Sequence, residues 1–278
     1  MTLHHSAQRL ALSQNLCAFF QPILELRGDV LRLVAFEGFA HGAEGTFQAS
    51  PVLHDVALES GQDLTALDLA RITRVVRDGA ELPDTADLSL NVHTSTLALF
   101  PEFPRFLAEC AAEAGFPLTR ILLELNVRGG FGLGNEHLDA LEDLRAHGVG
   151  VALDDVGEGE TNLDQVLELK PEILKLSPHL THGLLHDPRR QAILEALVDM
   201  TRKMGGRVLA KNLESIEDFR IARWMGVTLH QGYLFGVPGP IELWKTHPFP
   251  QEWPLRSFMR QPPRLVRPPD PISPDRIH

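Results

Sequence analysis

Two adjacent aspartates, Asp154 and Asp155, end the apolar run 149–153, and a glycine-broken loop follows at 157–159. A hydrophobic strand that ends in paired carboxylates places negative charge at the rim of a pocket, where a divalent metal ion is the usual counter-charge. A metal site is therefore the first hypothesis. Lys211, at the end of another apolar run, complicates it, because a metal site does not ordinarily include a cation.

The elements that must position these residues follow one pattern along nearly the whole chain. Short β-type runs alternate with helical segments, as in a parallel α/β fold. We expect eight strands, which suggest a closed barrel, at 18–24, 31–36, 88–92, 121–125, 149–154, 173–176, 207–210 and 227–231. Apolar residues at three- and four-residue spacing predict helices at 64–76, 103–114, 137–147, 190–204 and 216–225. Only residues 27–29 separate the first two runs, which predicts an antiparallel hairpin.

In a TIM-like (β/α)8 barrel the carboxyl ends of the strands meet at one pocket, so scattered polar residues become one site. Nearly every predicted strand delivers such a residue there: Glu37, Asn91, Glu124, Asp154, Asp155, Lys175, Lys211 and Gln231. Carboxylate and amide oxygens are the ligands that Mg²⁺ or Mn²⁺ selects. For any one of these residues a surface capping or ion-pairing role would be favoured, but for all of them together a shared site is the better explanation.

Composition narrows the class of protein. The chain has 278 residues, enough for one large domain, and its 44% apolar and 23% charged residues are those of an ordinary globular protein. A net charge of −11 argues against an extended nucleic-acid surface. No apolar stretch reaches bilayer length, and residues 1–6 lack the features of a signal peptide, so we expect a cytoplasmic protein without membrane contact. The separated Cys17 and Cys110 indicate neither a disulfide framework nor a thiolate metal site.

The chain changes character near its end. Proline recurs every few residues from position 248, a composition that cannot form a packed domain. We therefore predict a barrel domain at 1–240 and a proline-rich arm at 241–278. The arm is expected to lie over the barrel, and the alternative is a strap that docks a partner or braces a dimer.

Two other motifs carry less weight. The glycine run at 129–134 follows a strand, but its spacing departs from that of a dinucleotide-binding fingerprint, and we interpret it as a flexible loop. His179, His182 and His186 have the spacing of a zinc site on a helix. Pro178, Gly183 and Pro188 disfavour a continuous helix there, so exposed histidines are expected.

Six motifs in order make the chain resemble a known family, the EAL-type phosphodiesterases that open the bacterial second messenger cyclic di-GMP. The resemblance runs from about residue 20 to residue 238. Residues 20–23 resemble the family's "YQPI", 90–92 its "VNLS", 123–125 its "EIT", 152–159 its "ALDDFGTG", 173–176 its "ILKID" and 231–238 its "QGYLFGRP". The ordered set is far more specific than any one motif.

The resemblance implies roles for individual residues. The first metal ion would be held by Glu37, Asn91, Glu124 and Asp154, and Asp154 would bridge to a second ion held by Asp155. Lys175 matches the lysine beside the attacking water, and Glu214 and Asp155 join it in the predicted catalytic set. Gln21, His41 and Gln231 are the predicted ligand-binding residues.

The chain also departs from the family pattern. Glu37-Gly38-Phe39 stands for Glu-Ala-Leu, and His41 stands for an arginine that grips a ligand phosphate, whose bidentate geometry imidazole does not reproduce. Lys211 stands where a carboxylate for the second metal belongs. The metal-facing groups then carry a formal −2 in place of −4, which balances one divalent ion. Glu158, Glu160 and Ser177 are further changes near the site.

These departures predict a degenerate member of the family that holds one Mg²⁺ or Mn²⁺ ion more readily than two. We expect Lys211 to pair with Asp155, and the alternative is that its flexible side chain swings out to solvent. The favoured function is a receptor for cyclic di-GMP, or a protein-interaction adaptor, with lost or weak hydrolysis. The alternative is an active Mg²⁺- or Mn²⁺-dependent phosphodiesterase that gives the linear dinucleotide pGpG. A homodimer or a complex with a protein partner is expected.

Overall fold

Eight strands close into a barrel in the computed structural model, which describes residues 16–42, 64–126, 134–158, 163–246 and 252–260. The strands are β1 (Leu16–Arg27), β2 (Val30–Gly42), β3 (Asp87–His93), β4 (Ile121–Asn126), β5 (Gly150–Val156), β6 (Ile173–Leu176), β7 (Arg207–Ala210) and β8 (Leu229–Gln231). Neighbours from β2 to β8 run parallel, whereas β1 is antiparallel to both β2 and β8. The predicted TIM-like barrel with an antiparallel first pair is confirmed.

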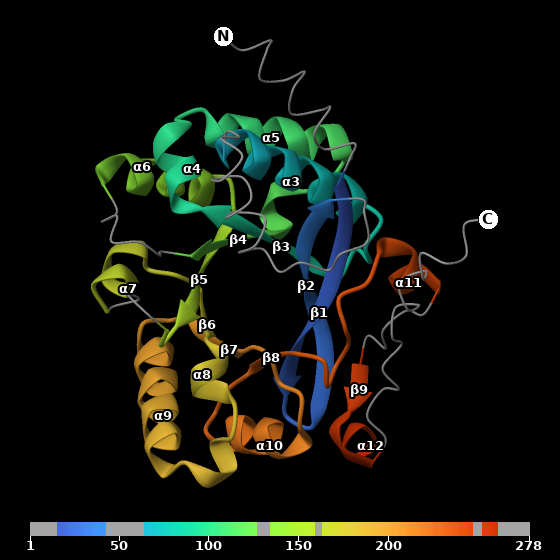
Figure 1. Cartoon of the computed structure of the whole chain (residues 1–278), viewed down its shortest axis with the longest axis vertical. Helices are drawn as coiled ribbons and strands as arrows, with labels where there is room; N and C mark the ends of the chain where they lie inside the picture. The colour runs from blue at the N-terminus through green and yellow to red at the C-terminus, as the bar shows by residue number, and fades with distance from the viewer. Residues whose placement is uncertain (1–15, 43–63, 127–133, 159–162, 247–251, 261–278) are drawn as a thin grey trace, which may run out of the picture.

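The β1–β2 hairpin is longer than the sequence predicted. Its pairing runs from Leu16 opposite Gly42 to Arg27 opposite Val30. Gly28 has a φ of 59° in the two-residue turn, a conformation that favours glycine. Figure 1 shows the hairpin as two long blue arrows on one side of the ring. Polar residues of both strands, including Gln21 and Glu37, therefore lie side by side in register.

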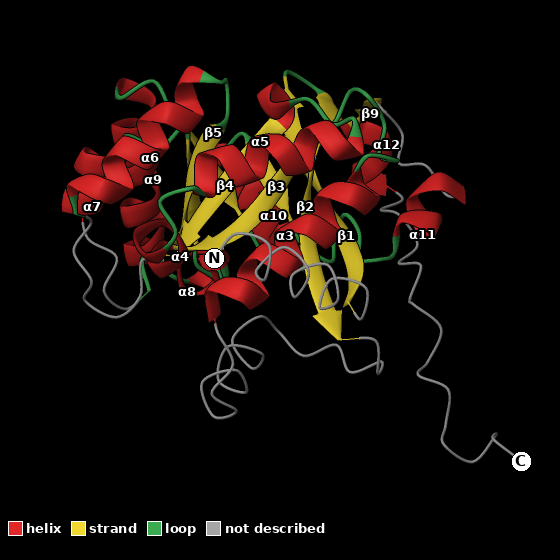
Figure 2. Ribbon diagram, turned by 90° about the horizontal axis from the view of Figure 1, so that it is seen from above, coloured by secondary structure: helices red, strands yellow, loops and turns green. Residues whose placement is uncertain are grey.

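Helices surround the ring of strands on its outer side (Figures 1 and 2). They are α3 (Leu64–Gly79), α4 (Thr94–Leu99), α5 (Phe103–Ala114), α6 (Asn135–Ala146), α7 (Leu163–Leu169), α8 (Pro178–Thr181), α9 (Pro188–Lys203) and α10 (Ile216–Trp224), with single 3-10 turns at Leu118–Arg120 and Leu184–His186. One large apolar cluster fills the layer between helices and strands. A second, small cluster inside the barrel consists of Ile23, Ala35, Ala152, Ile173, Leu209 and Leu229. These residues form the floor beneath the polar strand ends.

Part of the predicted C-terminal arm packs against the barrel. Beyond α11 (Ile241–Thr246), the short strand β9 (Glu252–Pro254) pairs with the start of β2, and α12 (Leu255–Arg260) follows. Phe258 of α12 is fully buried and stacks on Phe235 with ring centroids 5.3 Å apart. Residues 252–260 of the arm therefore lie over the barrel, and residues 247–251 and 261–278 lie outside the described part.

The structure also bears on two weaker predictions. The three histidines do not share a helix: α8 ends at Thr181, Gly183 has a φ of 67°, and His179, His182 and His186 are all exposed. The glycine run at 129–134 lies outside the described residues apart from Gly134. No helix in the described ranges is long and apolar enough to cross a membrane.

Candidate metal and ligand site at the carboxyl ends of the strands

Strand β5 is bulged where it carries the two aspartates. Its pairing with β6 is in register to Leu153 and resumes at Val156, so Asp154 and Asp155 together face one residue of β6. Asp155 has a left-handed φ of 53°. Successive residues of a regular strand face opposite sides, and a bulge removes that alternation. Two neighbouring carboxylates can therefore meet the same cation.

That cation is Lys211, which follows β7. Its Nζ lies 2.7 Å from Asp154 Oδ1 and also contacts Asp155 Oδ1. Asn126, at the end of β4, donates to the second oxygen of Asp155 at 2.7 Å. The predicted pair with Asp155 is confirmed, and the structure adds a contact with Asp154 that was not predicted. The alternative, a side chain turned out to solvent, is wrong, because the Lys211 side chain is only 13% exposed.

The charge of Lys211 is stabilised by its partners. Burial alone would lower the pKa of its ammonium, but the attraction of Asp154 and Asp155 outweighs burial and repulsion by Lys175, so the pKa is raised. The group therefore stays protonated at neutral pH. Lys211 acts as an internal counter-ion for the aspartate pair.

A second lysine holds the other two carboxylates. Lys175 of β6 is fully buried, and its Nζ lies 2.7 Å from Glu37 Oε2 and contacts Glu124 Oε2. Burial would lower the pKa of Lys175, but Glu124 and Glu37 raise it above its usual value. Burial raises the pKa of Glu124 to about 8, with the charge of Glu37 adding to the effect. For Glu37 the effect of burial is outweighed by Lys175, so its pKa falls to about 2.

Glu37 is also held by amide side chains from two other strands. Asn91 of β3 donates to Glu37 Oε1 at 3.0 Å, and Gln231 of β8 donates to Glu37 Oε2 at 2.7 Å. Gln231 also donates to Gln21 Oε1 at 3.2 Å, and Gln21 donates to the carbonyl of Gly236 at 2.9 Å. These contacts give Glu37 a single orientation at the centre of the site.

Most of the predicted site residues thus meet through hydrogen bonds and ion pairs, and two do not join the network. Glu214 is exposed and makes no hydrogen bond or ion pair with a described residue. His41 is buried at the end of β2, where its ring lies 5.9 Å from that of Phe19. The predicted roles of Glu214 in catalysis and of His41 in ligand binding remain predictions.

Sequence reasoning missed two residues that hold the carboxylates. Ser89 donates to Glu124 Oε1, and Asn126 donates to Asp155. Ser89 lies two residues before Asn91 on β3, so strand alternation alone places both side chains on one face. Asn126 directly follows the predicted end of its strand. Both could have been found by extending the search by one or two residues along each strand.

The oxygen ligands of this site are of the kind that a hard cation prefers. Their present arrangement, however, does not suit two cations. Glu37, Asn91, Glu124 and Asp154 offer the carboxylate and amide oxygens that Mg²⁺ or Mn²⁺ prefers. Lys175 and Lys211 instead occupy the space between the carboxylates. Consistent with this, no three acidic, histidine or cysteine side chains among the described residues stand in metal-ligating geometry. Lys211 contacts both aspartates of the site.

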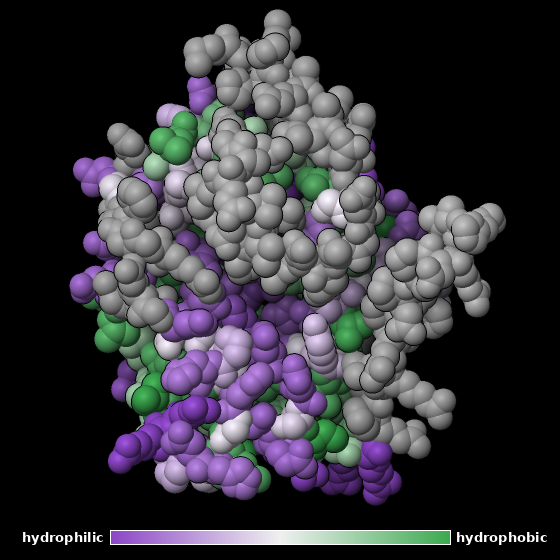
Figure 3. Space-filling model, in the orientation of Figure 1, coloured by the Kyte–Doolittle hydropathy of each residue, from purple (hydrophilic) through white to green (hydrophobic). Residues whose placement is uncertain are grey.

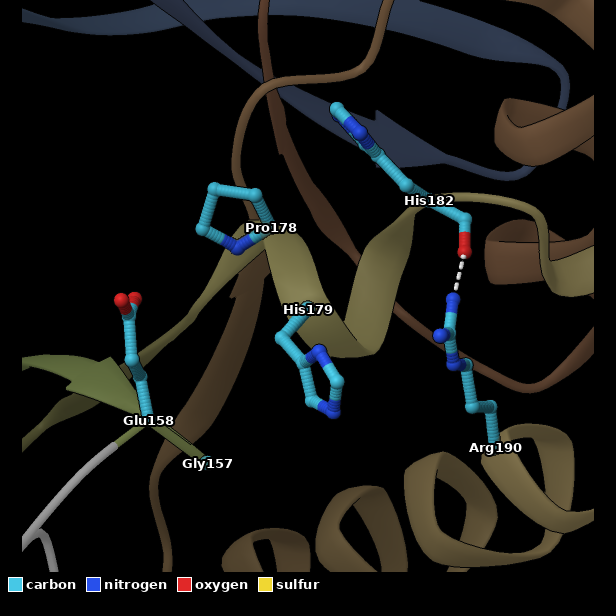
Figure 4. A pocket seen from close by; sticks show the side chains of 6 residues that line it. All are labelled: Gly157, Glu158, Pro178, His179, His182 and Arg190. Carbon is cyan, nitrogen blue, oxygen red and sulfur yellow. Dashed lines mark hydrogen bonds between the residues drawn. The ribbon is translucent and has the colours of Figure 1, made fainter.

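The surface around the site is mainly polar. Figure 3 has the same orientation as Figure 1. Hydrophilic residues gather near its middle, where Figure 1 shows the ring of strands. Next to the ends of β5 and β6 lies a hollow of about 660 Å³ lined by Gly157, Glu158, Pro178, His179, His182 and Arg190. In Figure 4 Glu158 and Arg190 lie on opposite sides of it, and Arg190 donates to the His182 carbonyl at 2.6 Å. This hollow includes none of the network's carboxylates.

Comparison with known proteins gives the family. The model of the EAL domain matches residues 5–238. The cyclic di-GMP phosphodiesterase RocR of Pseudomonas aeruginosa is 29% identical over 165 residues, which are 58% of this chain and 41% of RocR. The probable cyclic di-GMP phosphodiesterase PdeG of Escherichia coli is 24% identical over 227 residues, 79% of this chain and 44% of PdeG. The chain therefore spans less than half the length of these two relatives.

Solved structures show the same fold. Klebsiella pneumoniae BlrP1 in complex with calcium and cyclic di-GMP superposes with a TM-score of 0.74 at 24% identity, covering 83% of this chain and 57% of BlrP1. BlrP1 has also been solved as a manganese complex with the same ligand. A closed barrel with a reversed first strand and a carboxylate network at its carboxyl ends defines the class of protein. The chain belongs to the EAL domain family.

Proposed function

We propose that this protein is a degenerate EAL domain that binds cyclic di-GMP as a receptor, or serves as an adaptor for a protein partner, with little or no hydrolysis. The observation that carries the proposal is the placement of Lys211 between Asp154 and Asp155. A metal-dependent hydrolase needs those oxygens for cations that generate hydroxide and stabilise charge on the phosphate. In this chain an ammonium holds them.

The electrostatics support a loss of the second metal. An ammonium about 4 Å from a cation repels each unit of its charge by roughly 4 kcal/mol at an effective dielectric of 20. Lys211 cannot easily lose its proton to relieve this repulsion, because its pKa is raised by the aspartates. We propose that the site takes at most one Mg²⁺ or Mn²⁺ ion, held by Glu37, Asn91, Glu124 and Asp154.

An active phosphodiesterase remains a second candidate, and a specific observation favours it. Lys175, Glu37 and Glu124 are locked together by short contacts, and Asn91 and Gln231 hold Glu37 in place. A site that had lost its catalytic role would not need to keep these contacts. Under this alternative, metal binding displaces Lys211 from Asp154 and the site gives linear pGpG.

Calorimetric titration with cyclic di-GMP, in buffer with EDTA and in buffer with MgCl2, tests the proposal. The receptor function predicts binding in both buffers, because Lys211 and Lys175 already offset charge that metal ions would otherwise neutralise. If no heat is measured at micromolar ligand in either buffer, the receptor function is refuted and the adaptor function is the one that stands. Binding that requires Mg²⁺, together with release of linear dinucleotide, would favour the phosphodiesterase.

A further inference from the structure

Helix α3 carries an arginine, Arg71, whose charge has no ion-pair partner among the described residues. The Nε of Arg71 is buried without a hydrogen bond, and among the described residues its guanidinium makes no ion pair. Arg74, three residues on, pairs with Asp78 at 2.7 Å, so the helix pairs its other half-buried arginine locally. Leaving a guanidinium partly buried and unpaired costs free energy. The chain therefore carries a cation that its own described side chains do not neutralise.

The carboxylate that attracts Arg71, that of Asp68, already has other hydrogen-bond partners. Asp68, one turn before Arg71, accepts from the backbone N–H of His93 at 3.0 Å and from Thr96 Oγ1 at 2.8 Å, both through Oδ2. It attracts Arg71 electrostatically but makes no ion pair with it. Burial lowers the pKa of Arg71, yet a guanidinium remains charged in proteins. Arg71 therefore has a buried N–H group without an acceptor, whereas the carboxylate of Asp68 already accepts two hydrogen bonds.

Packing places Arg71 near the carboxyl end of β2. A Cβ on Gly38 would lie 2.2 Å from Val75 Cγ1, so α3 lies directly against β2 one residue beyond Glu37. Arg71 is one turn before Val75 on the same face of α3. The helix runs back along β2, so one turn earlier corresponds to the end of that strand, near His41. The charge of Arg71 also contributes to lowering the pKa of His41, after burial, as expected for neighbours.

We infer that Arg71 binds a phosphate group of the ligand at the β2 and β3 side of the pocket mouth. The inference rests on the proposed function, and it names a residue outside the carboxylate network. A guanidinium presents N–H donors in a fixed fork that matches a phosphodiester oxygen pair. His41, buried and with a lowered pKa, supplies no positive charge there at neutral pH. The network's two lysines are engaged with carboxylates, whereas Arg71 has no ion-pair partner among the described residues and is available to an anion.

The test is titration of cyclic di-GMP into the full chain and into three variants at constant ionic strength. Arg71→Met keeps the length of the side chain but removes its charge, and it should weaken binding roughly ten- to hundred-fold. Arg71→Lys keeps the charge without the fork and should bind with intermediate affinity. Arg77→Met removes an exposed arginine of the same helix and should bind within about twofold of wild type, because its charge is solvated.

Thermal unfolding without ligand separates ligand binding from a structural role. Because Arg71 has no ion-pair partner among the described residues, Arg71→Met should melt at the same or a higher temperature than wild type. Lower affinity together with a lower melting temperature would assign Arg71 to the fold and overturn the inference. Equal affinity of wild type and Arg71→Met would refute the inference alone. If the wild type binds no cyclic di-GMP, the receptor function fails and the inference fails with it.

Discussion

Replacing Lys211 by methionine should make the stability of the protein depend on metal ions. The substitution removes the ammonium but keeps a side chain of similar length, and it leaves Asp154 and Asp155 side by side with side chains 10% and 12% exposed. Removing one partner of a fully buried ion pair costs roughly 3–5 kcal/mol. These side chains keep some contact with water, so we expect the free energy of unfolding in EDTA to fall by about 2–3 kcal/mol.

Manganese should restore that loss. Without the ammonium, the repulsion of roughly 4 kcal/mol per unit of metal charge disappears and two carboxylates become available. Urea unfolding of wild type and Lys211→Met, each in EDTA and in excess MnCl2, measures both effects. Manganese should change the wild type little and should stabilise the variant to at least the wild-type level. The control, Lys245→Met, removes an exposed lysine paired with Glu81 and should behave as wild type in both buffers. A variant as stable as wild type in EDTA and indifferent to manganese would refute the reasoning.

Three further predictions concern the frame of the site. Phe258→Ala removes a fully buried ring stacked on Phe235 and should cost about 3–5 kcal/mol in chemical unfolding; a loss below about 1 kcal/mol would show that α12 is dispensable. Gly232→Ala places a Cβ 2.2 Å from the backbone of Leu213, at a φ of 151°, and should lower the melting temperature or prevent folding; an unchanged melting curve would contradict this contact. Burial lowers the pKa of His230 to about 3, against an ordinary value near 6.5. Below about pH 6.5 the imidazole of His230 therefore binds a proton in the unfolded chain but stays neutral in the native state. The free energy of unfolding is highest above about pH 6.5 and falls below it by up to about 1.4 kcal/mol per pH unit. His230→Phe should remove that contribution between pH 6.5 and 4, and an unchanged pH profile would count against it.

The fold could be predicted because it rests on repeated local patterns. Helix α5 was predicted at 103–114 and is observed at Phe103–Ala114, because prolines flank its start and Gly115 takes a left-handed conformation after its end. The hairpin was predicted from a short turn between two apolar runs. Its strands were predicted too short, because an antiparallel ribbon continues through residues that mix apolar and polar side chains.

The site could be predicted in its membership and only partly in its contacts. Strand ends identified Glu37, Asn91, Glu124 and Lys175, which the barrel brings together. That Lys211 contacts Asp154 as well as Asp155 depends on the β5 bulge. A bulge changes the direction of one carboxylate but leaves the order of polar and apolar residues the same. The residue pattern therefore does not specify the bulge.

Arg71 was not predicted for a related reason. Its importance lies in the absence of a described partner and in the closeness of α3 to β2 at Gly38. A helical pattern gives the face on which an arginine lies, but it does not give the distance to a neighbouring strand or the state of a nearby carboxylate. A partly buried charge without a described partner is a property of packing.

The central claim is that Lys211 holds the aspartates that a hydrolytic metal would need. Its most direct test is the rate at which wild type and Lys211→Glu convert cyclic di-GMP to the linear dinucleotide in MnCl2, followed by chromatography. We expect little or no product from the wild type, and a rise of orders of magnitude in manganese-dependent turnover when the carboxylate is restored. Manganese-dependent turnover by the wild type that Lys211→Glu does not increase would contradict the claim.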